Sequence, residues 1–184
     1  MENDSLMLDE ERVKENYLIL LLGCVDKPIR GEIHLQKEMF ILANSFPIMR
    51  NFFSFDEHLF GPWDKEINEI VDESFSYKEA FQKEDGKISL TNSGKEIYSD
   101  LIKENEDKLD FQYLMSAMQL VRKLYDNLTN DELLLLIYLS YPNFKINSIK
   151  YKELVENKDR RRKLLDNLLE KSIITVEKYN EFYV

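Results

Sequence analysis

The sequence predicts a mainly α-helical protein of α+β type that contains a short β-hairpin. Hydrophobic residues make up 43% of the 184 residues and charged residues 33%, a balance that is typical of a packed core. Only 5 glycines and 4 prolines are present, too few for a loop-rich β-sandwich. Through most of the chain, apolar residues recur at the three- and four-residue spacing of helices.

The first part of the chain predicts three helices. A nearly continuous apolar stretch predicts a helix over residues 9–26, and Pro28 breaks it because proline cannot continue a helix. Residues 32–45 have helical spacing and predict the second helix. An extended aromatic segment over residues 51–60 follows. Then comes a predicted turn at Gly61 and Pro62 and a third helix over residues 63–73.

A hairpin and a fourth helix follow these three. Two β-prone segments flank Asp85-Gly86, the dipeptide that tight hairpin turns prefer. Thr91 then has the position of a helix N-cap. The order helix, helix, helix, two-stranded wing is that of a winged helix-turn-helix, which we therefore expect over residues 1–108.

Beyond a polar stretch at residues 103–110, the sequence predicts a helical C-terminal extension over residues 109–184. Phe111 to Leu128 has the spacing of an amphipathic helix. Thr129, followed three residues later by Glu132, predicts the start of the next helix. Ser148 is the expected cap of a further one.

The net charge of the chain bears on which class of partner it binds. The net charge is −10, and residues 1–110 carry 25 acidic against 13 basic residues. Neutralisation of phosphates supplies most non-specific DNA affinity, so this balance disfavours nucleic acid and favours a protein partner. No apolar run approaches the roughly 20 residues of a membrane span, and the N-terminus is acidic rather than basic. We expect a cytoplasmic protein that does not enter membranes.

Three motifs resemble the Panacea-type winged-helix antitoxin family and its archaeal and bacterial relatives over roughly residues 12–105. They are Leu35-Gln36-Lys37 with Phe40-Ile41-Leu42, Phe60-Gly61-Pro62-Trp63, and Leu90-Thr91-Asn92-Ser93-Gly94. The resemblance implies a winged-helix protein that regulates by binding, often by holding a toxin inactive. The long helical extension departs from the short antitoxin pattern. The candidate partner-binding residues lie in the first two motifs and are Gln36, Lys37, Phe60, Gly61, Pro62 and Trp63.

Trp63 has two interpretations. After a Gly-Pro turn at a helix start, it can staple the entry of the helix into the core. Alternatively, Trp63 and neighbouring aromatic residues can line a protein-binding groove, because aromatic side chains dominate interface hot spots.

One basic cluster stands out on the predicted helix of the extension: Arg160, Arg161, Arg162 and Lys163, with Lys158 preceding them. Three roles fit it. The cluster can pair with acidic groups of the same chain or of a second copy. It can form an exposed helix face that pairs with Glu153, Glu156 and Asp166. It can also bind nucleic-acid phosphates.

Catalytic and metal chemistry find little support. Adjacent residues of an extended segment point to alternate faces, so Asp56, Glu57 and His58 would not converge on one ion. Cys24 lies in an apolar run and is expected to be a buried core residue. The acids of residues 64–73 are interpreted as a solvated helix face. We therefore expect no cofactor, no metal and no enzymatic activity.

The function that the sequence favours is regulation through protein–protein binding. A dimeric DNA-binding transcriptional regulator is the alternative. A homodimer is compatible with both functions.

Overall fold

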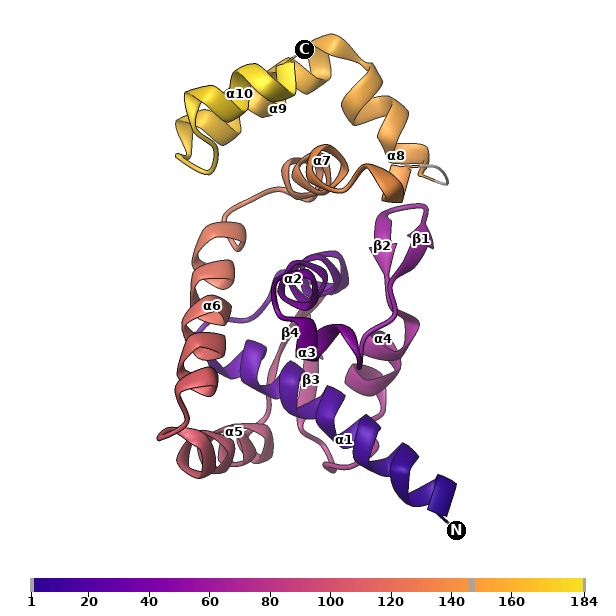
Figure 1. The fold of residues 1–184 in the computed structure, drawn as a ribbon, viewed down its shortest axis with the longest axis vertical. Helices are drawn as coiled ribbons and strands as arrows, with labels where there is room; N and C mark the ends of the chain where they lie inside the picture. Colours follow the sequence, from indigo (N-terminus) through magenta and orange to yellow (C-terminus); the bar gives the residue numbers. More distant parts are fainter. Residues whose placement is uncertain (1, 146–147, 184) are drawn as a thin grey trace. The chain divides into compact units, whose positions relative to one another are not determined.

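A computed structural model describes residues 2–145 and 148–183, with the backbone alone for residues 2–9, 145 and 149. It confirms a mainly helical chain and shows two small antiparallel sheets, of which one hairpin was expected (Figure 1). The chain divides into two compact units, residues 1–54 with 64–126, and residues 55–63 with 127–184. Within the described residues, no helix is long and apolar enough to span a membrane.

The first unit is built around α1 and α2, whose buried apolar residues include residues 18–22 of α1 and Leu35, Met39, Phe40 and Leu42 of α2. Helix α5 packs on α1, and α6 packs on both α1 and α2. The elements are α1 (Glu2–Gly23), α2 (Glu32–Ser45), α3 (Pro47–Arg50), α4 (Lys65–Asp72), β3 (Phe81–Glu84), β4 (Lys87–Leu90), α5 (Asn92–Asn105) and α6 (Leu109–Tyr125).

The hairpin of the first unit pairs β3 with β4 in antiparallel register, and Asp85 and Gly86 form its turn with positive φ. Ile29, between α1 and α2, forms an isolated antiparallel β-bridge with Ile88 of β4. Its amide donates to the carbonyl of Ile88 at 2.8 Å, and the Ile88 amide donates back at 3.0 Å. The hairpin is thereby fastened to the α1–α2 connection.

The second unit combines a hairpin with the C-terminal helices. The hairpin strands are β1 (Asp56–His58) and β2 (Gly61–Trp63). The helical elements are α7 (Asn130–Ser140), the 3₁₀ turn η1 (Pro142–Lys145), α8 (Ile149–Tyr151), the π-helical turn η2 (Lys152–Glu156), α9 (Lys158–Glu170) and α10 (Val176–Tyr183). Thr129 and Glu132 form a capping box at the start of α7, and Ser148 caps α8, as expected.

The structure differs from the sequence expectation at several places. The third helix was expected to start at Trp63, but Trp63 lies in β2 and α4 begins at Lys65. Helix α1 begins at Glu2 and ends at Gly23. The turn predicted at Gly61 and Pro62 is wrong, because both residues lie in β2 and the turn falls at Leu59 and Phe60. The division between the units follows residue 126, beyond α6, whereas we expected it after residue 108.

Gly94 fits the start of α5 tightly against the β3–β4 hairpin. The Thr91 hydroxyl accepts a hydrogen bond from the Gly94 amide at 3.1 Å, as expected of an N-cap, and the Thr91 amide donates to the carbonyl of Ala80 at 3.1 Å. A Cβ atom on Gly94 would overlap that carbonyl oxygen. The absence of a side chain at position 94 therefore permits this packing.

We expect Gly94→Ala to lower the free energy of unfolding by about 1–3 kcal/mol, because the added methyl group forces backbone apart in a packed region. Urea unfolding measured by circular dichroism checks this. Ser93→Ala, at an exposed neighbouring position, is the control and should change stability little. Equal stability of the two variants would contradict the close approach described here.

Candidate functional site

A buried charge cluster surrounds Arg122, a fully buried residue of α6. Its guanidinium donates to the backbone carbonyls of Leu21 at 3.0 Å and Lys27 at 2.5 Å, which belong to the end of α1 and the loop after it. It also donates to both carboxylate oxygens of Asp126, at 3.2 and 3.3 Å. Its Nε atom lies 3.5 Å from a carboxylate oxygen of Glu38 in α2. One side chain therefore joins α6 to α1 and α2.

His34 and Glu38 complete this cluster on one face of α2. Both are buried, and the His34 Nδ1 atom lies 3.7 Å from the nearer Glu38 oxygen. Neither ring nitrogen and neither carboxylate oxygen has a hydrogen-bond partner among the described residues. Burial raises the pKa of Glu38, and the neighbouring His34 and Arg122 partly offset that increase. The ion pair with Arg122 is thus what compensates a carboxylate held away from water.

Cys24 borders the same cluster and confirms the expectation of a buried core residue. Its thiol donates to the Leu21 carbonyl at 3.2 Å. Burial raises the pKa of the thiol to about 11, while Arg122 lowers it and Glu38 raises it further. At neutral pH the thiol is protonated, so it lacks the thiolate that a nucleophile needs.

Gln36 forms a second buried polar junction. Its amide nitrogen donates to the Asp64 carbonyl at 2.7 Å and to the Asn68 side chain at 2.9 Å, and its oxygen accepts from the Asp64 amide at 2.9 Å. The Asp64 carboxylate accepts from the amides of Ser54 at 2.9 Å and Glu66 at 3.0 Å. Asp64 thus caps α4 and ties it to residue 54, at the two chain positions where the segment 55–63 leaves and rejoins the first unit.

Gln36 and Lys37 were both expected among the partner-binding residues. Each is fully buried in the structure. Gln36 is occupied by the hydrogen bonds just described, and burial lowers the pKa of Lys37 to about 7. Their side chains therefore face the interior, and the exposed part of the candidate site lies in the β1–β2 hairpin.

The hairpin places the motif Phe60-Gly61-Pro62-Trp63 along one turn and one strand. Gly61 and Pro62 are buried. The partly exposed indole of Trp63 stacks on the ring of His58, with centroids 4.9 Å apart and planes inclined by 30°. At the tip, Leu59 is 46% exposed and Phe60 is 38% exposed. The hairpin thus exposes the apolar side chains of Leu59 and Phe60 at its tip, next to the stacked rings of His58 and Trp63.

The tip is held by polar contacts within the second unit. The Ser148 hydroxyl donates to the Leu59 carbonyl at 3.0 Å and forms a hydrogen bond with the Tyr138 hydroxyl. It also accepts from the amide of Tyr151, the last residue of the short helix α8 that Ser148 caps. The backbone of the tip is therefore fixed, although the Leu59 side chain is exposed.

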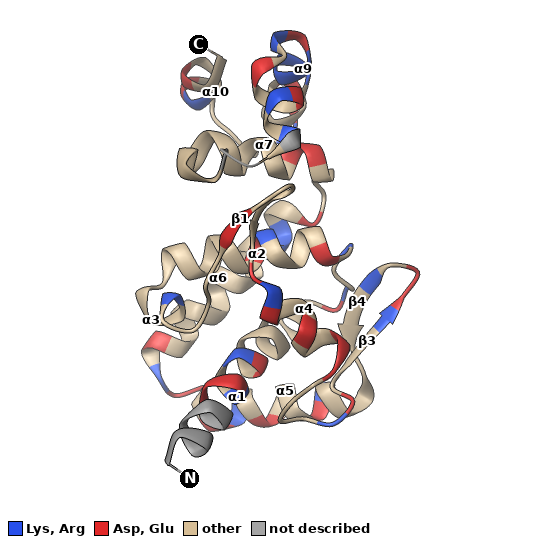
Figure 2. Ribbon diagram, turned by 90° about the vertical axis from the view of Figure 1, so that its right-hand side faces the viewer, with Lys and Arg blue, Asp and Glu red and all other residues tan. Residues whose placement is uncertain are grey.

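Helix α4 has an acidic exterior (Figure 2). Its only base, Lys65, pairs with Glu69 at 2.5 Å, while Asp72 and Glu66 pair with lysines from outside the helix, Lys83 and Lys14. Asp64 differs from the expected solvated face because it is buried as the N-cap. The acids that remain exposed or partly exposed are Glu66, Glu69, Asp72 and Glu73.

The basic cluster lies on α9 (Figure 2). Arg160 pairs with Asp131 of α7 at 2.5 Å, and Arg161 donates to the Tyr183 carbonyl at 3.0 Å. Arg162 and Lys163 are exposed, and neither forms an ion pair within residues 10–144 and 148–183. Half of the cluster therefore stabilises the second unit, and half is accessible.

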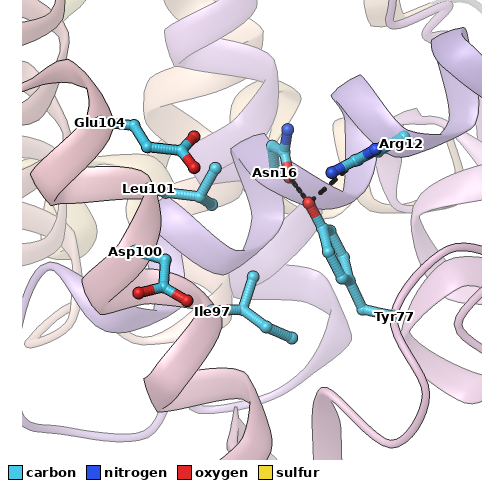
Figure 3. A pocket seen from close by; sticks show the side chains of 7 residues that line it. All are labelled: Arg12, Asn16, Tyr77, Ile97, Asp100, Leu101 and Glu104. Atoms are coloured by element: carbon cyan, nitrogen blue, oxygen red, sulfur yellow. Dashed lines mark hydrogen bonds between the residues drawn. The ribbon is translucent and has the colours of Figure 1, made fainter.

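A small pocket in the first unit has a volume of about 300 Å³ (Figure 3). The Tyr77 hydroxyl lies between α1 side chains, accepting from Arg12 at 3.2 Å and donating to Asn16 at 2.8 Å. Asp100 and Glu104 of α5 line the other side. The volume is at the lower limit for ligand pockets, and the two carboxylates and Arg12 are exposed to solvent.

Asp56, Glu57 and His58 form strand β1. Each pairs with a different residue of β2, so successive side chains alternate between the two faces of the hairpin. Among the residues that the structure describes, no three His, Cys, Asp or Glu side chains are grouped to bind a metal.

No protein-family model matches the chain, and no curated protein matches it. The resemblance to the Panacea-type antitoxins therefore stays a prediction drawn from three motifs.

Sequence analysis missed the buried cluster. Arg122 follows Leu114 and Met118 at four-residue spacing, so it occupies a position of the buried stripe of α6. Glu38 likewise lies among the buried residues of α2. The sequence did indicate a charged residue at a position of each helix that is otherwise apolar. The pattern of one helix, however, does not show which residue of another helix is its partner.

We expect Arg122→Met to lower the free energy of unfolding by about 3–5 kcal/mol, because it removes the guanidinium from the buried Glu38 carboxylate and leaves Asp126 with Lys27, whose Nζ atom lies 3.7 Å away. In this variant the stability should recover as pH falls toward 4.5, the ordinary pKa of Glu38. A carboxyl group whose pKa is raised by folding stabilises the fold when protonated, and this contribution is lost as pH rises through the folded pKa.

Urea unfolding over a pH series measures both effects. Glu38→Gln added to Arg122→Met should restore part of the stability and flatten the pH dependence. Lys103→Met, at an exposed position of α5, is the control for loss of a surface cation. A loss of stability no larger for Arg122→Met than for Lys103→Met would contradict the role given to this side chain.

Proposed function

We propose that the protein is a winged-helix regulator that acts by binding another protein through the tip of its β1–β2 hairpin. The order of elements supports the winged-helix assignment. Three helices (α1, α2 and α4) are followed by a two-stranded wing (β3 and β4), and β4 is bridged to Ile29 in the α1–α2 connection. Catalysis has no part in this proposal.

The acidic exterior of α4 favours protein binding over DNA binding as the function of this protein. In a winged helix the third helix is the usual reader of the major groove. Here α4 would bring Glu66, Glu69 and Asp72 toward DNA phosphates, and its one lysine is paired with Glu69. Because each of these acids already pairs with a lysine, α4 offers no free positive charge to phosphates.

The observation that carries the proposal is the exposed apolar tip at Leu59 and Phe60. The tip backbone is fixed within the second unit by the Ser148 hydroxyl, which donates to the Leu59 carbonyl. A preorganised apolar projection loses little entropy when it enters a pocket on a partner. By the antitoxin resemblance, that partner is a toxin held inactive.

A dimeric DNA-binding regulator is the second candidate. The observation that favours it is the exposure of Arg162 and Lys163 on α9, where they can reach phosphates without breaking an ion pair. Arg160 and Arg161, by contrast, are already engaged within the second unit.

Affinity purification of the intact protein from lysate of its source at low salt tests the two functions. We expect a stoichiometric protein to co-purify, and we expect Phe60→Ser to lose it because the apolar tip is removed. Ile48→Ser, which changes an exposed apolar residue of α3, is the matched control and should retain it. Circular dichroism of both variants confirms that they are folded.

A different result would favour the second candidate. Nuclease-sensitive nucleic acid that co-purifies without such a protein, and that is lost when Arg162→Ala and Lys163→Ala are combined, would contradict regulation through the hairpin tip. Retention of the protein partner by Phe60→Ser would also contradict it.

A further inference from the structure

Helix α6 carries a second apolar face that none of the described side chains of its unit covers. Leu109 and Tyr113 are each 60% exposed and Leu120 is 56% exposed, and Ser116 lies between them. The spacing of four, three and four residues places these side chains on one side of the helix. The buried residues Leu114, Met118 and Val121 lie on the opposite side, toward α1 and α2. We call the exposed set, Leu109, Tyr113, Ser116 and Leu120, the α6 stripe.

We propose that the α6 stripe binds a second copy of this chain, with the two α6 helices packed antiparallel across a two-fold axis. This inference concerns self-association, goes beyond the proposed function and does not depend on it. A continuous exposed apolar stripe on a helix is typical of a protein–protein contact. Two further observations select a second copy as the occupant.

The stripe is complementary to itself when it is reversed. Its four positions are symmetric about a point between Leu114 and Met115. Antiparallel pairing about this point sets Leu109 of one copy opposite Leu120 of the other, twice. It also sets each Tyr113 opposite the small Ser116, so a bulky ring meets a gap. Alternation of large and small side chains is what close helix packing requires.

Charge at the two ends of α6 favours the same direction. Asp107 and Asp110 are exposed at its N-terminal end, beside Lys108, and Lys123 is exposed at its C-terminal end. Asp107, Asp110 and Lys123 form no ion pair within the described side chains. Antiparallel pairing places each Lys123 near the acidic end of the other helix, whereas parallel pairing places like charges together.

The size of the contact sets the expected strength. Helix α6 has 17 residues and is therefore about 25 Å long. A pair of such helices buries less than the roughly 1,600 Å² of a standard interface, so the dimer should form reversibly and depend on concentration.

Sedimentation velocity of the full chain over a concentration series tests self-association. We expect a shift from monomer to dimer as concentration rises. Leu120→Glu should remain monomeric over the same series, because it places two carboxylates in the contact. Val176→Glu, at a 59% exposed apolar position of α10, is the matched control and should dimerise as the unaltered protein does. A monomer at every concentration, or a dimer of Leu120→Glu, would overturn the proposal.

Cysteine cross-linking tests the direction of the helices. Leu109→Cys and Leu120→Cys are made separately, and the native Cys24 is buried and does not interfere. In the antiparallel dimer, two copies of residue 109 are separated by eleven residues, about 16 Å along the helix axis. A disulfide requires Cα atoms within about 7 Å. We therefore expect cross-links in an oxidised mixture of the two variants and none in either alone. Efficient cross-linking of either variant alone would overturn the antiparallel arrangement.

Discussion

The Arg122 guanidinium is the group through which three helices of the first unit are held together. It satisfies backbone carbonyls at the end of α1 and in the loop that follows, and it neutralises carboxylates of Glu38 and Asp126. Because both carboxylates are buried, loss of the Arg122 guanidinium would destabilise the cluster; Asp126 would keep Lys27, whose Nζ atom lies 3.7 Å away. This requirement orients α6. Its buried apolar residues alone would specify its rotation against α1 and α2 less tightly than the directional contacts of Arg122 do.

Asp64 has a comparable role within the first unit. Its backbone binds Gln36 of α2, and its carboxylate caps α4 and accepts from the Ser54 amide. The orientation of α4, whose acidic exterior argues against DNA reading, is thereby fixed against α2 within the first unit. Two motifs that resemble a family signature thus differ in what they contribute: Gln36 of the first forms buried hydrogen bonds, and Phe60 of the second is an exposed apolar group.

The sequence predicts features that depend on near neighbours. Helix α2 has the expected bounds, and Thr91, Thr129 and Ser148 cap helices because a hydroxyl and an amide three residues later suffice to make the contact. The turn at Leu59 and Phe60 lacks glycine and proline, so the adjacent Gly-Pro pair misplaced it. The buried cluster and the grouping of α6 with the first unit depend on contacts distant in sequence, such as Arg122 with Leu21. A single helix pattern carries no record of such contacts.

Hydrogen–deuterium exchange of the native protein, resolved by peptide mass spectrometry, tests most directly whether α6 is an integral part of the first unit. If the Arg122 cluster holds α6 to α1 and α2, the amides of all three helices should exchange through the same opening and show similar protection. Exchange in α6 that is much faster than in α1 and α2 would contradict the account, because it would mean that α6 opens independently of the helices to which Arg122 joins it.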